Sequence, residues 1–234
     1  MNHSPEHLPV LSIVVPCYKE EAVLPETHRR LSALLDVMIA AGEVDATSYV
    51  LYVNDGSRDQ TWPLICRLHD EEKYACGLNL AANVGHQNAL MAGLETVKER
   101  CDVAVSIDAD LQDDVEAIRA MVASYKQGHD IVYGVRQERT TDTFFKRTTA
   151  LAFYRLMQRM GVNVVYNHAD FRLMSRRALQ YLCRFRERNL FLRGLIPLVG
   201  YQTDVVKYNR AKRFAGESKY PLRKMLNFAI DGIT

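Results

Sequence analysis

The sequence has no long apolar run. None reaches the ~18 residues that a helix needs to span a bilayer, and the N-terminus lacks the apolar segment of a signal peptide. Over the residues given, we therefore expect a chain that is soluble or bound peripherally to a membrane.

Cysteines are few, and they form no C-x-x-C pair. An odd number of widely separated cysteines, several inside apolar runs, is typical of reduced thiols in a cytosolic protein. The spacing argues against a disulfide framework and against a zinc site. The five are Cys17, Cys66, Cys76, Cys101 and Cys183.

Two common nucleotide-binding signatures are also missing. The chain has neither G-x-G-x-x-G nor a P-loop, which counts against dinucleotide oxidoreductases and NTPases. The net charge is only +2, so the total charge does not indicate nucleic acid as a partner. Charge is uneven, however: residues 207–224 contain seven Lys or Arg and one acid, Glu217. This run is either a solvated face or the surface that meets an anionic partner.

The chain of 234 residues is 48% hydrophobic and 25% charged, as expected for one large globular domain. In the first half, short β-branched runs alternate with helical periodicity. This pattern predicts an α/β fold with a mainly parallel sheet and helices on both faces. The predicted strands are Val10–Val15, Tyr49–Val53, Gly77–Ala81, Val103–Ile107 and Ile131–Val135, and the predicted helices span 24–39, 61–72, 85–97 and 115–125.

The second half has a different character, which we read as an elaboration of the same domain. A long helix, a short strand, two apolar segments, a basic loop and the start of a basic amphipathic helix are predicted. The long helix spans Thr143–Met160 and the short strand Asp170–Met174. The two apolar segments are Ala178–Phe185 and Phe191–Val199, the basic loop is Lys207–Tyr220, and the amphipathic helix begins at Leu222–Ile230.

The sharpest chemical feature is the pair of carboxylates in Asp108-Ala109-Asp110, directly after a predicted strand. Ligands bind at the carboxyl ends of strands in such sheets. Hard oxygen ligands prefer Mg²⁺ or Mn²⁺, ions that usually hold substrate phosphates, and Gln112 can add a carbonyl oxygen. A solvated loop that caps the next helix is the alternative.

Two further strand ends carry polar residues. Asp55, in Asn54-Asp55-Gly56-Ser57, is either a turn residue or an acceptor of hydrogen bonds from a base or ribose. Asn83 to His86 precede a helix, whose backbone N–H groups can meet an anion. We read His86 as a surface residue or a satisfied core histidine in preference to a ligand.

Taken in order, these segments resemble the motifs of family 2 glycosyltransferases with the GT-A fold. The later motifs resemble the polyprenyl-phosphate branch, namely bactoprenol glucosyltransferases and, more distantly, dolichol-phosphate mannose synthases. The likeness covers roughly residues 10–234. It rests on Val15-Pro16-Cys17-Tyr18-Lys19-Glu20, Asn54 to Ser57, Asn83 to His86, Asp108 to Asp113, Tyr133 to Arg136, Asp170 to Leu173 and Phe214-Ala215-Gly216-Glu217-Ser218-Lys219-Tyr220.

The resemblance implies roles for individual residues. Asp110 and Gln112 would hold Mg²⁺ or Mn²⁺, and Asp170 would line the pocket for the sugar and the acceptor. Arg136, with Lys146 or Arg147, would face an acceptor phosphate. The nucleotide would contact Pro16, Tyr18, Glu20, Asp55, Asn83, Asp108 and Ala109, and the acceptor phosphate or the membrane would contact Arg210, Arg213, Ser218 and Lys219.

The sequence departs from the resembled family in two places. Asp113-Asp114-Val115-Glu116 stands where relatives often have a Pro-Pro pair after the first Asp, and we expect this to alter the entry to the next helix. His168-Ala169-Asp170 replaces a Gly-rich version of that motif.

The resemblance implies a domain plan: residues 1–9 as a flexible N-terminus, 10–221 as the GT-A catalytic domain, and 222–234 as the start of a juxtamembrane helix. Since relatives continue into transmembrane helices, we expect the chain to stop before such helices. No nucleic acid partner is expected, and a homo-oligomer is left open.

The implied reaction is inverting transfer of glucose from UDP-glucose to a polyprenyl (undecaprenyl) phosphate at the cytosolic face of the cell membrane. A phosphate monoester is already ionised at neutral pH, so it needs cationic positioning more than a general base. GDP-mannose or another nucleotide sugar is an alternative donor. A polysaccharide hydroxyl is an alternative acceptor, for which Asp170 would be the base, and a non-enzymatic membrane scaffold is the last alternative.

Overall fold

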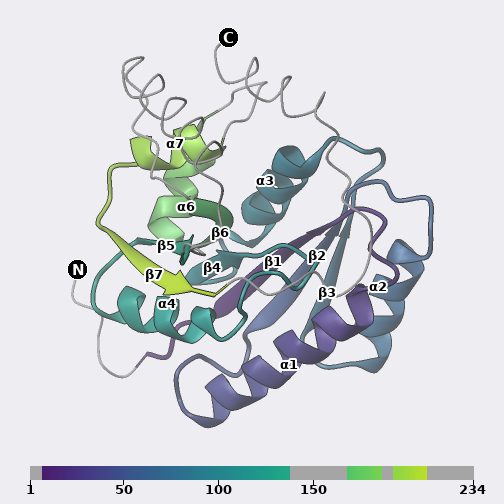
Figure 1. Ribbon diagram of the computed structural model, residues 1–234, viewed down its shortest axis with the longest axis horizontal. Coiled ribbons are helices and arrows are strands. Elements are labelled where there is room, and N and C mark those ends of the chain that lie inside the picture. Colours follow the sequence, from purple (N-terminus) through teal and green to yellow (C-terminus); the bar gives the residue numbers. More distant parts are fainter. Residues whose placement is uncertain (1–6, 138–167, 186–191, 210–234) are drawn as a thin grey trace.

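Seven strands form one sheet in the order β3-β2-β1-β4-β6-β5-β7 (Figure 1). The structure is a computed structural model, and it describes residues 7–137, 168–185 and 192–209. The strands are β1 (Leu11–Cys17), β2 (Tyr49–Asn54), β3 (Ala75–Asn79), β4 (Val103–Ser106), β5 (Ile131–Arg136), β6 (His168–Ser175) and β7 (Thr203–Tyr208). The helices are α1 (Leu24–Ala40), α2 (Thr61–Glu71), α3 (His86–Val97), α4 (Ala117–Lys126), α6 (Arg176–Leu182) and α7 (Leu192–Leu198).

The sheet is mainly parallel, as the sequence predicts. Strand β1 pairs in parallel with β2 and β4, β2 pairs in parallel with β3, and β5 pairs in parallel with β7. The exception is β6, which lies antiparallel between β4 and β5. The run Asp170–Met174 predicts a strand but not its direction, because alternation of side chains is the same in both directions.

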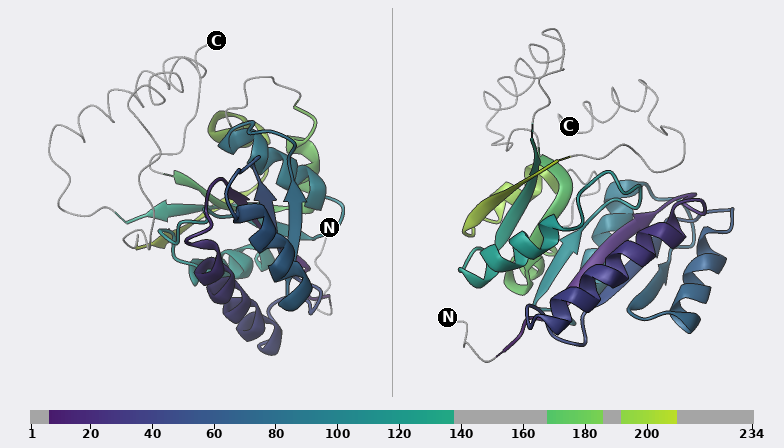
Figure 2. Two further views of the ribbon diagram at one scale, coloured as in Figure 1. Left: turned by 90° about the vertical axis from the view of Figure 1, so that its right-hand side faces the viewer. Right: turned by 60° about the horizontal axis from the view of Figure 1, so that its bottom comes forward.

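Helices cover both faces of the sheet (Figures 1 and 2). Helices α1, α2 and α4 contribute to one buried apolar cluster, and α3, α6 and α7 contribute to the other. Every residue of β1 is buried, with Ile13 and Val15 in the first cluster and Val14 in the second. Burial on both sides is the reason that this strand reads as a continuous apolar run.

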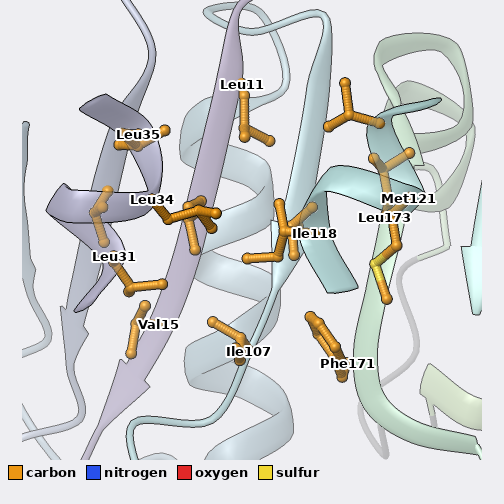
Figure 3. Packing of buried hydrophobic residues seen from close by; sticks show 14 of the residues in the cluster. Leu11, Val15, Leu31, Leu34, Leu35, Ile107, Ile118, Met121, Phe171 and Leu173 are labelled. Carbon is orange, nitrogen blue, oxygen red and sulfur yellow. The ribbon is translucent and has the colours of Figure 1, made fainter. Parts of the chain in front are cut away.

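Figure 3 shows the first cluster, to which α1 and α4 both contribute side chains. Helix α1 supplies Leu31, Leu34 and Leu35, α4 supplies Ile118 and Met121, and strand and strand-end residues include Leu11, Val15, Ile107, Phe171 and Leu173. This packing fixes the strands whose carboxyl ends carry the predicted polar residues.

Several element boundaries differ from the sequence prediction by one or two residues, and three of them bear on the site or on the C-terminal part of the sheet. Strand β3 ends at Asn79, two residues before the predicted Ala81, because the residues after Asn79 leave the sheet towards the loop before α3. Helix α4 begins at Ala117, two residues after the first apolar position. The predicted loop from Lys207 onward is wrong for its first two residues, which belong to β7.

Strand β7 was missed because it lies at an edge of the sheet. Its side chains alternate between exposed and half-buried positions up to Tyr208, which is 3% exposed and packs edge-on against Phe171 with ring centroids 5.2 Å apart. An edge strand with Asp and Lys among its residues has too few apolar positions for a strand prediction.

The remaining predictions fall outside the described residues. They are the structure of residues 1–6, the helix Thr143–Met160, and the segment from residue 210 to the end. Within the described part of the chain, none of the helices has the length and apolar character needed to cross a bilayer.

Candidate active site

A cavity of about 300 Å³ lies at the carboxyl ends of β1, β2 and β4. It is lined by nine residues that the sequence predicts as site residues: Pro16, Tyr18, Glu20, Asp55, Asn83, Asp108, Ala109, Asp110 and Asp170. Two charged residues in the lining were not predicted, His86 and Arg193. A second hollow of about 530 Å³ shares Tyr18 and Asn83 with it.

Asp55 holds one wall of the cavity. Its buried carboxylate accepts hydrogen bonds from the backbone N–H of Val84 (2.7 Å) and Gly85 (3.1 Å), and from Nδ2 of Asn83 (2.9 Å). Gly56 makes this approach possible, since its φ is +59° and an added Cβ would lie 2.5 Å from backbone atoms of Ala82 and Asn83. The turn after β2 therefore fixes the loop that precedes α3.

The loop after β1 forms the adjoining wall. The backbone N–H of Lys19, a residue with φ of +56°, donates to Oγ of Ser57 at 3.0 Å. The next N–H, of Glu20, donates to Oγ1 of Thr61 at 2.9 Å. The Tyr18 side chain between these anchors and β1 is 37% exposed. A loop held in this way can present an aromatic face to a planar ligand.

The Asp108-Ala109-Asp110 segment forms the floor on the side of β4. The carbonyl of Ala109 accepts a hydrogen bond from Oγ1 of Thr27 on α1 (2.7 Å). Oδ1 of Asp110 accepts one from the N–H of Gln112 (3.1 Å), and Leu111 between them has φ of +58°. The chain therefore turns back on itself, and Gln112 lies beyond the residues that line the cavity.

Negative charge is concentrated at this segment. The pKa of Asp108 is raised to about 6, because loss of hydration and, to a smaller extent, the nearby carboxylates of Asp170, Asp113 and Asp110 outweigh the opposite effect of His86. A divalent cation would relieve this repulsion. The donor set of carboxylates and one amide oxygen is therefore chemically suited to Mg²⁺ or Mn²⁺.

Protein groups alone do not complete a cation cage here. Among the described residues, no cluster of three or more His, Cys, Asp or Glu side chains is arranged to hold a metal ion. Magnesium-like ions are usually bound by one or two carboxylates together with substrate phosphates and water. The residues present fit that kind of site, in which the ligand completes the coordination.

Asp170 lies on β6 and lines the same cavity as Asp108 and Asp110, and its carboxylate is surrounded by donor groups. Nη2 of Arg172 donates to Oδ1 at 2.5 Å, and Nε of Arg193 lies 3.4 Å from the same oxygen. Nε2 of Gln87 donates to Oδ2 at 3.2 Å, and Nε2 of His86 lies 3.4 Å from it. Burial acts to raise the pKa of Asp170, but the neighbouring His86 and the charges of Arg172 and Arg193 outweigh it and hold the pKa well below its usual value.

This environment suits Asp170 to anchoring and not to proton abstraction. A carboxylate with a strongly lowered pKa is a weak base, and general-base catalysis works best with a pKa near the operating pH. The reading of Asp170 as the base for a hydroxyl acceptor is therefore disfavoured by its surroundings. Its neighbour Arg172 is 1% exposed, so the pair is buried and fixed.

Arg193 is a cavity residue that the sequence did not reveal. It lies in the first turn of α7, where the backbone N–H of Leu192 donates to Oε1 of Gln87 (3.3 Å), and its side chain is 35% exposed. The surrounding run, Phe191–Val199, was read as an apolar segment. A single arginine within an apolar run is the signal that would have indicated it.

His86 is the second missed residue. The reading of His86 as a surface or satisfied core residue is wrong, because its Nε2 is buried without a hydrogen bond and lies beside Asp170 and Asp108 at 3.4 and 3.7 Å. Burial acts to lower the pKa of His86, but these two carboxylates outweigh it and raise the pKa above its usual value.

Arg136 does not line the cavity. Its Nη2 lies 3.3 Å from Oδ1 of Asp113 and its Nε donates to the hydroxyl of Tyr208 (3.2 Å), which itself donates to Asp113 at 2.5 Å. This triad, in which Asp113 and Tyr208 are buried and Arg136 is partly exposed, ties the ends of β5 and β7 to the loop before α4. Asp113, part of a departure from the resembled motifs, is thus a structural partner. The role of Arg136 towards an acceptor phosphate stays a prediction.

Six predicted acceptor or membrane residues lie outside the described residues. They are Lys146, Arg147, Arg210, Arg213, Ser218 and Lys219. The five cysteines are described, and all are free thiols, with Cys17 and Cys101 buried.

The matching family model and two similar proteins all identify the chain as similar to glycosyltransferases. The family model described as Glycosyl transferase family 2 matches residues 12–183. The uncharacterized glycosyltransferase YkoT of Bacillus subtilis is 54% identical over 226 residues, which are 97% of this chain and 67% of that protein. The bactoprenol glucosyl transferase of Shigella phage SfV is 37% identical over 225 residues, 96% of this chain and 71% of that protein. The chain thus spans about two thirds of the length of these relatives.

Solved structures share the fold at low identity. Glucosyl-3-phosphoglycerate synthase from Mycobacterium tuberculosis, in complex with Mn²⁺, UDP and phosphoglyceric acid, matches with a TM-score of 0.63 and 19% identity, over 95% of this chain and 75% of that one. Mannosyl-3-phosphoglycerate synthase from Rubrobacter xylanophilus matches with a TM-score of 0.62 and 14% identity, over 96% and 72%. At this identity the likeness establishes the GT-A fold and nothing further.

Proposed function

The chain belongs to glycosyl transferase family 2, and from that membership we propose that it transfers glucose from UDP-glucose to a polyprenyl phosphate such as undecaprenyl phosphate. The 37% identity to proteins named bactoprenol glucosyl transferase supports this acceptor and this sugar. Structural neighbours determined with UDP-glucose and Mn²⁺ support the donor and a divalent cation, Mg²⁺ or Mn²⁺.

The state of Asp170 is the observation that carries the proposal. In the described part of the chain, this is the carboxylate that the sequence offers as a base, and four surrounding donors make it a weak one. A sugar hydroxyl needs a base to remove its proton, whereas a phosphate monoester, with a second pKa of ~6, is largely ionised at neutral pH. The site is thus better matched to an acceptor that is already charged.

Asp108, whose pKa is raised to about 6, is assigned to the donor side and not to acceptor activation. Its raised pKa arises from loss of hydration and crowded carboxylates, and a bound cation would reverse the second effect. We assign the nucleotide contacts to the walls around Tyr18, Asp55 and Asp108, together with Pro16, Glu20, Asn83 and Ala109.

Asp110 and Gln112 are assigned to the cation, held jointly with the diphosphate of the donor. When bound, the cation neutralises charge that develops on the β-phosphate as the nucleotide leaves. The residues of the chain bind and orient the donor around this point. Direct attack by the acceptor oxygen from the opposite side would invert the α-linked glucose to a β-linked product.

Arginines are assigned to the acceptor phosphate, because the planar guanidinium matches phosphate in geometry and charge. Arg193 is the candidate within the cavity, and it is held by Asp170 at 3.4 Å. Further candidates are Arg136, Lys146, Arg147, Arg210, Arg213, Ser218 and Lys219. Near an anionic membrane, each Lys or Arg of the 207–224 segment contributes ~1 kcal/mol, which supports docking at the cytosolic membrane face.

The domain plan follows from these assignments. Residues 10–221 are proposed as the catalytic domain, and 222–234 as the start of a juxtamembrane helix in a membrane-associated protein.

Product analysis tests the proposed reaction. The chain is incubated with a short-chain polyprenyl phosphate and a panel of UDP- and GDP-sugars, and products are identified by mass spectrometry and NMR. The expected result is a β-linked glucosyl phosphate formed from UDP-glucose with Mg²⁺ or Mn²⁺. An α-linked product would overturn the inversion, and transfer only from GDP-mannose would overturn the donor assignment.

A further inference from the structure

His86 occupies an enforced position at the start of α3. The preceding Gly85 has φ of +87°, a backbone conformation that favours glycine, and the carboxylate of Asp55 accepts its N–H. The turn therefore directs the first side chain of the helix into the cavity. The position of His86 therefore depends on the same hydrogen bonds to Asp55 that fix the cavity wall.

The imidazole lies between two carboxylates from different strands. Its Nε2 is 3.4 Å from Oδ2 of Asp170 on β6 and 3.7 Å from Oδ1 of Asp108 at the end of β4. A lone pair on this nitrogen would face two anions, so the nitrogen is expected to carry its proton. Without that proton, two carboxylates in a partly dehydrated site would repel each other across the gap.

Asp108 and Asp170 belong to different halves of the site. Asp108 lines the cavity beside Ala109 and Asp110, on the donor side, whereas Asp170 anchors Arg193 through Oδ1. The contact from His86 is therefore a link between the two halves. Gln87, the next residue of α3, extends the link by donating to Asp170 (3.2 Å) and accepting from the N–H of Leu192 on α7 (3.3 Å).

We propose that His86 is a positioning residue for glycosyl transfer: its Nε2–H bridges Asp108 and Asp170 and so fixes the donor-side carboxylate relative to the residue that anchors Arg193. This inference rests on the proposed function, since it assigns the two carboxylates to donor and acceptor. Residues that fix geometry for the reacting step affect kcat more than substrate affinity.

Three substitutions at one position test the bridge. The side-chain nitrogen of Gln reaches the position of Nε2 and can donate, whereas that of Asn reaches only as far as Nδ1. We expect His86→Ala and His86→Asn each to lower kcat by about 10- to 100-fold, the loss for a hydrogen bond to a charged group. His86→Gln should retain kcat within about fivefold, and the KM for UDP-glucose should stay within about threefold in all variants.

A matched control removes an imidazole elsewhere. His129, after α4, contacts Ser124 and lies outside the cavity, so His129→Gln is expected to leave both kcat and KM unchanged. If Gln at position 86 is no better than Asn, or if kcat of all three variants stays within about twofold of the parent chain, the bridge is wrong. If kcat, donor affinity and thermal stability all fall together in these variants, the role of His86 is purely structural, and that result would also overturn the proposed bridge.

Two readouts separate this inference from the proposed acceptor. If the parent chain does not turn over polyprenyl phosphate, the proposed function fails, and the variants are compared by slow hydrolysis of UDP-glucose without acceptor. In the ligand-free protein, ¹⁵N–¹H spectra of the imidazoles, assigned by loss of a signal in His86→Gln, should show a protonated Nε2 at His86. An unprotonated Nε2 would overturn the bridge whatever the acceptor is.

Discussion

At the scale of single residues, the role of each carboxylate in the cavity depends on the N–H groups and charges that surround it. Asp55 is satisfied by backbone N–H groups, and Asp170 by arginines and amide donors. Asp108 lies among the carboxylates of Asp170, Asp113 and Asp110, and its pKa is raised. We propose that the diphosphate lies beside Asp108, the cation at Asp110 and Gln112, and the acceptor beside Arg193.

The cation assignment predicts a large effect of Asp110→Asn. An amide is a weaker ligand than a carboxylate, so kcat should fall by on the order of 100-fold or more, as expected when stabilisation of the leaving group by a cation is lost. Steady-state release of UDP measures this. Asp114→Asn is the matched control, because Asp114 is exposed in the same segment and lines no part of the cavity. Equal loss in both variants would contradict the assignment.

The raised pKa of Asp108 predicts how cation binding depends on pH. A cation competes with the proton, so above pH 6 the carboxylate is ionised and the affinity for Mn²⁺ with UDP should be nearly constant. As pH falls below about 6, affinity should fall by up to about tenfold per pH unit. Isothermal titration calorimetry between pH 5 and 8 measures it. Asp108→Asn should remove the part of this dependence that comes from the protein and leave the part from the terminal phosphate of UDP, which itself titrates near pH ~6. A profile identical to that of the parent chain would argue against Asp108 as a source.

Arg193 should act on the acceptor and not on the donor. Removing its charge-assisted hydrogen bonds in Arg193→Ala should raise the acceptor KM by about 10- to 100-fold, with a smaller rise in Arg193→Lys, which keeps the charge but loses the planar fork. The donor KM should not change. Arg184→Ala is the control, since Arg184 is exposed and lies over the Tyr181 ring. A rise confined to the donor KM would contradict the acceptor assignment.

At the scale of elements, the site depends on turns after strands that are themselves buried. The strands that carry it, β1, β2 and β4, were predictable because they are buried on both faces and read as apolar runs. Their polar ends converge because parallel strands end at the same edge, which is how the sequence brought Tyr18, Glu20, Asp55, Asn83 and Asp108 to Asp110 together, whereas Pro16 and Asp170 were named only from the family resemblance.

What the sequence did not reveal comes from the half of the chain without that regularity. The direction of β6 and the existence of β7 depend on pairing partners far away in sequence, Val103 to Ser106 and Ile131 to Arg136. Arg193 reaches the cavity where the start of α7 meets the start of α3, through the hydrogen bond from Leu192 to Gln87, and His86 reaches it where Gly85 turns the chain. The strand pairings and the contact between α7 and α3 join segments far apart in sequence, and local patterns do not encode them; the lone arginine in an apolar run and the glycine before His86 were the local signals present.

A substitution at Gly56 tests whether the turn after β2, which carries Asp55, positions the nucleotide site. In Gly56→Ala the new Cβ would lie 2.5 Å from the backbone of Ala82 and Asn83, so the loop before α3 must move. We expect a loss of about 1–3 kcal/mol in the free energy of unfolding and a raised donor KM. Thermal unfolding and UDP-release kinetics measure the two effects.

Gly42→Ala separates backbone strain from this clash. Gly42 has a similar φ of +66°, but an added Cβ there meets nothing within 4 Å. It should lower stability by about 1–2 kcal/mol without changing the donor KM. If the donor KM is unchanged in Gly56→Ala as well, the loop does not position the nucleotide site.

At the scale of the whole molecule, one sheet with helices on both faces brings the proposed donor residues and Arg193 to the same cavity. The family and the GT-A fold are established for this chain by its similarity to known proteins. The acceptor is the central claim beyond them, and it depends on the argument that the site activates no hydroxyl.

The most direct measurement compares two acceptors that differ only in the phosphate. A short-chain polyprenyl phosphate and the corresponding free polyprenol are each supplied in detergent with UDP-glucose and Mn²⁺, and glucosylated lipid is quantified. We predict β-glucosyl phosphate from the first and no product from the second. Glucosylation of the free alcohol at a comparable rate, or of the alcohol alone, would contradict the account.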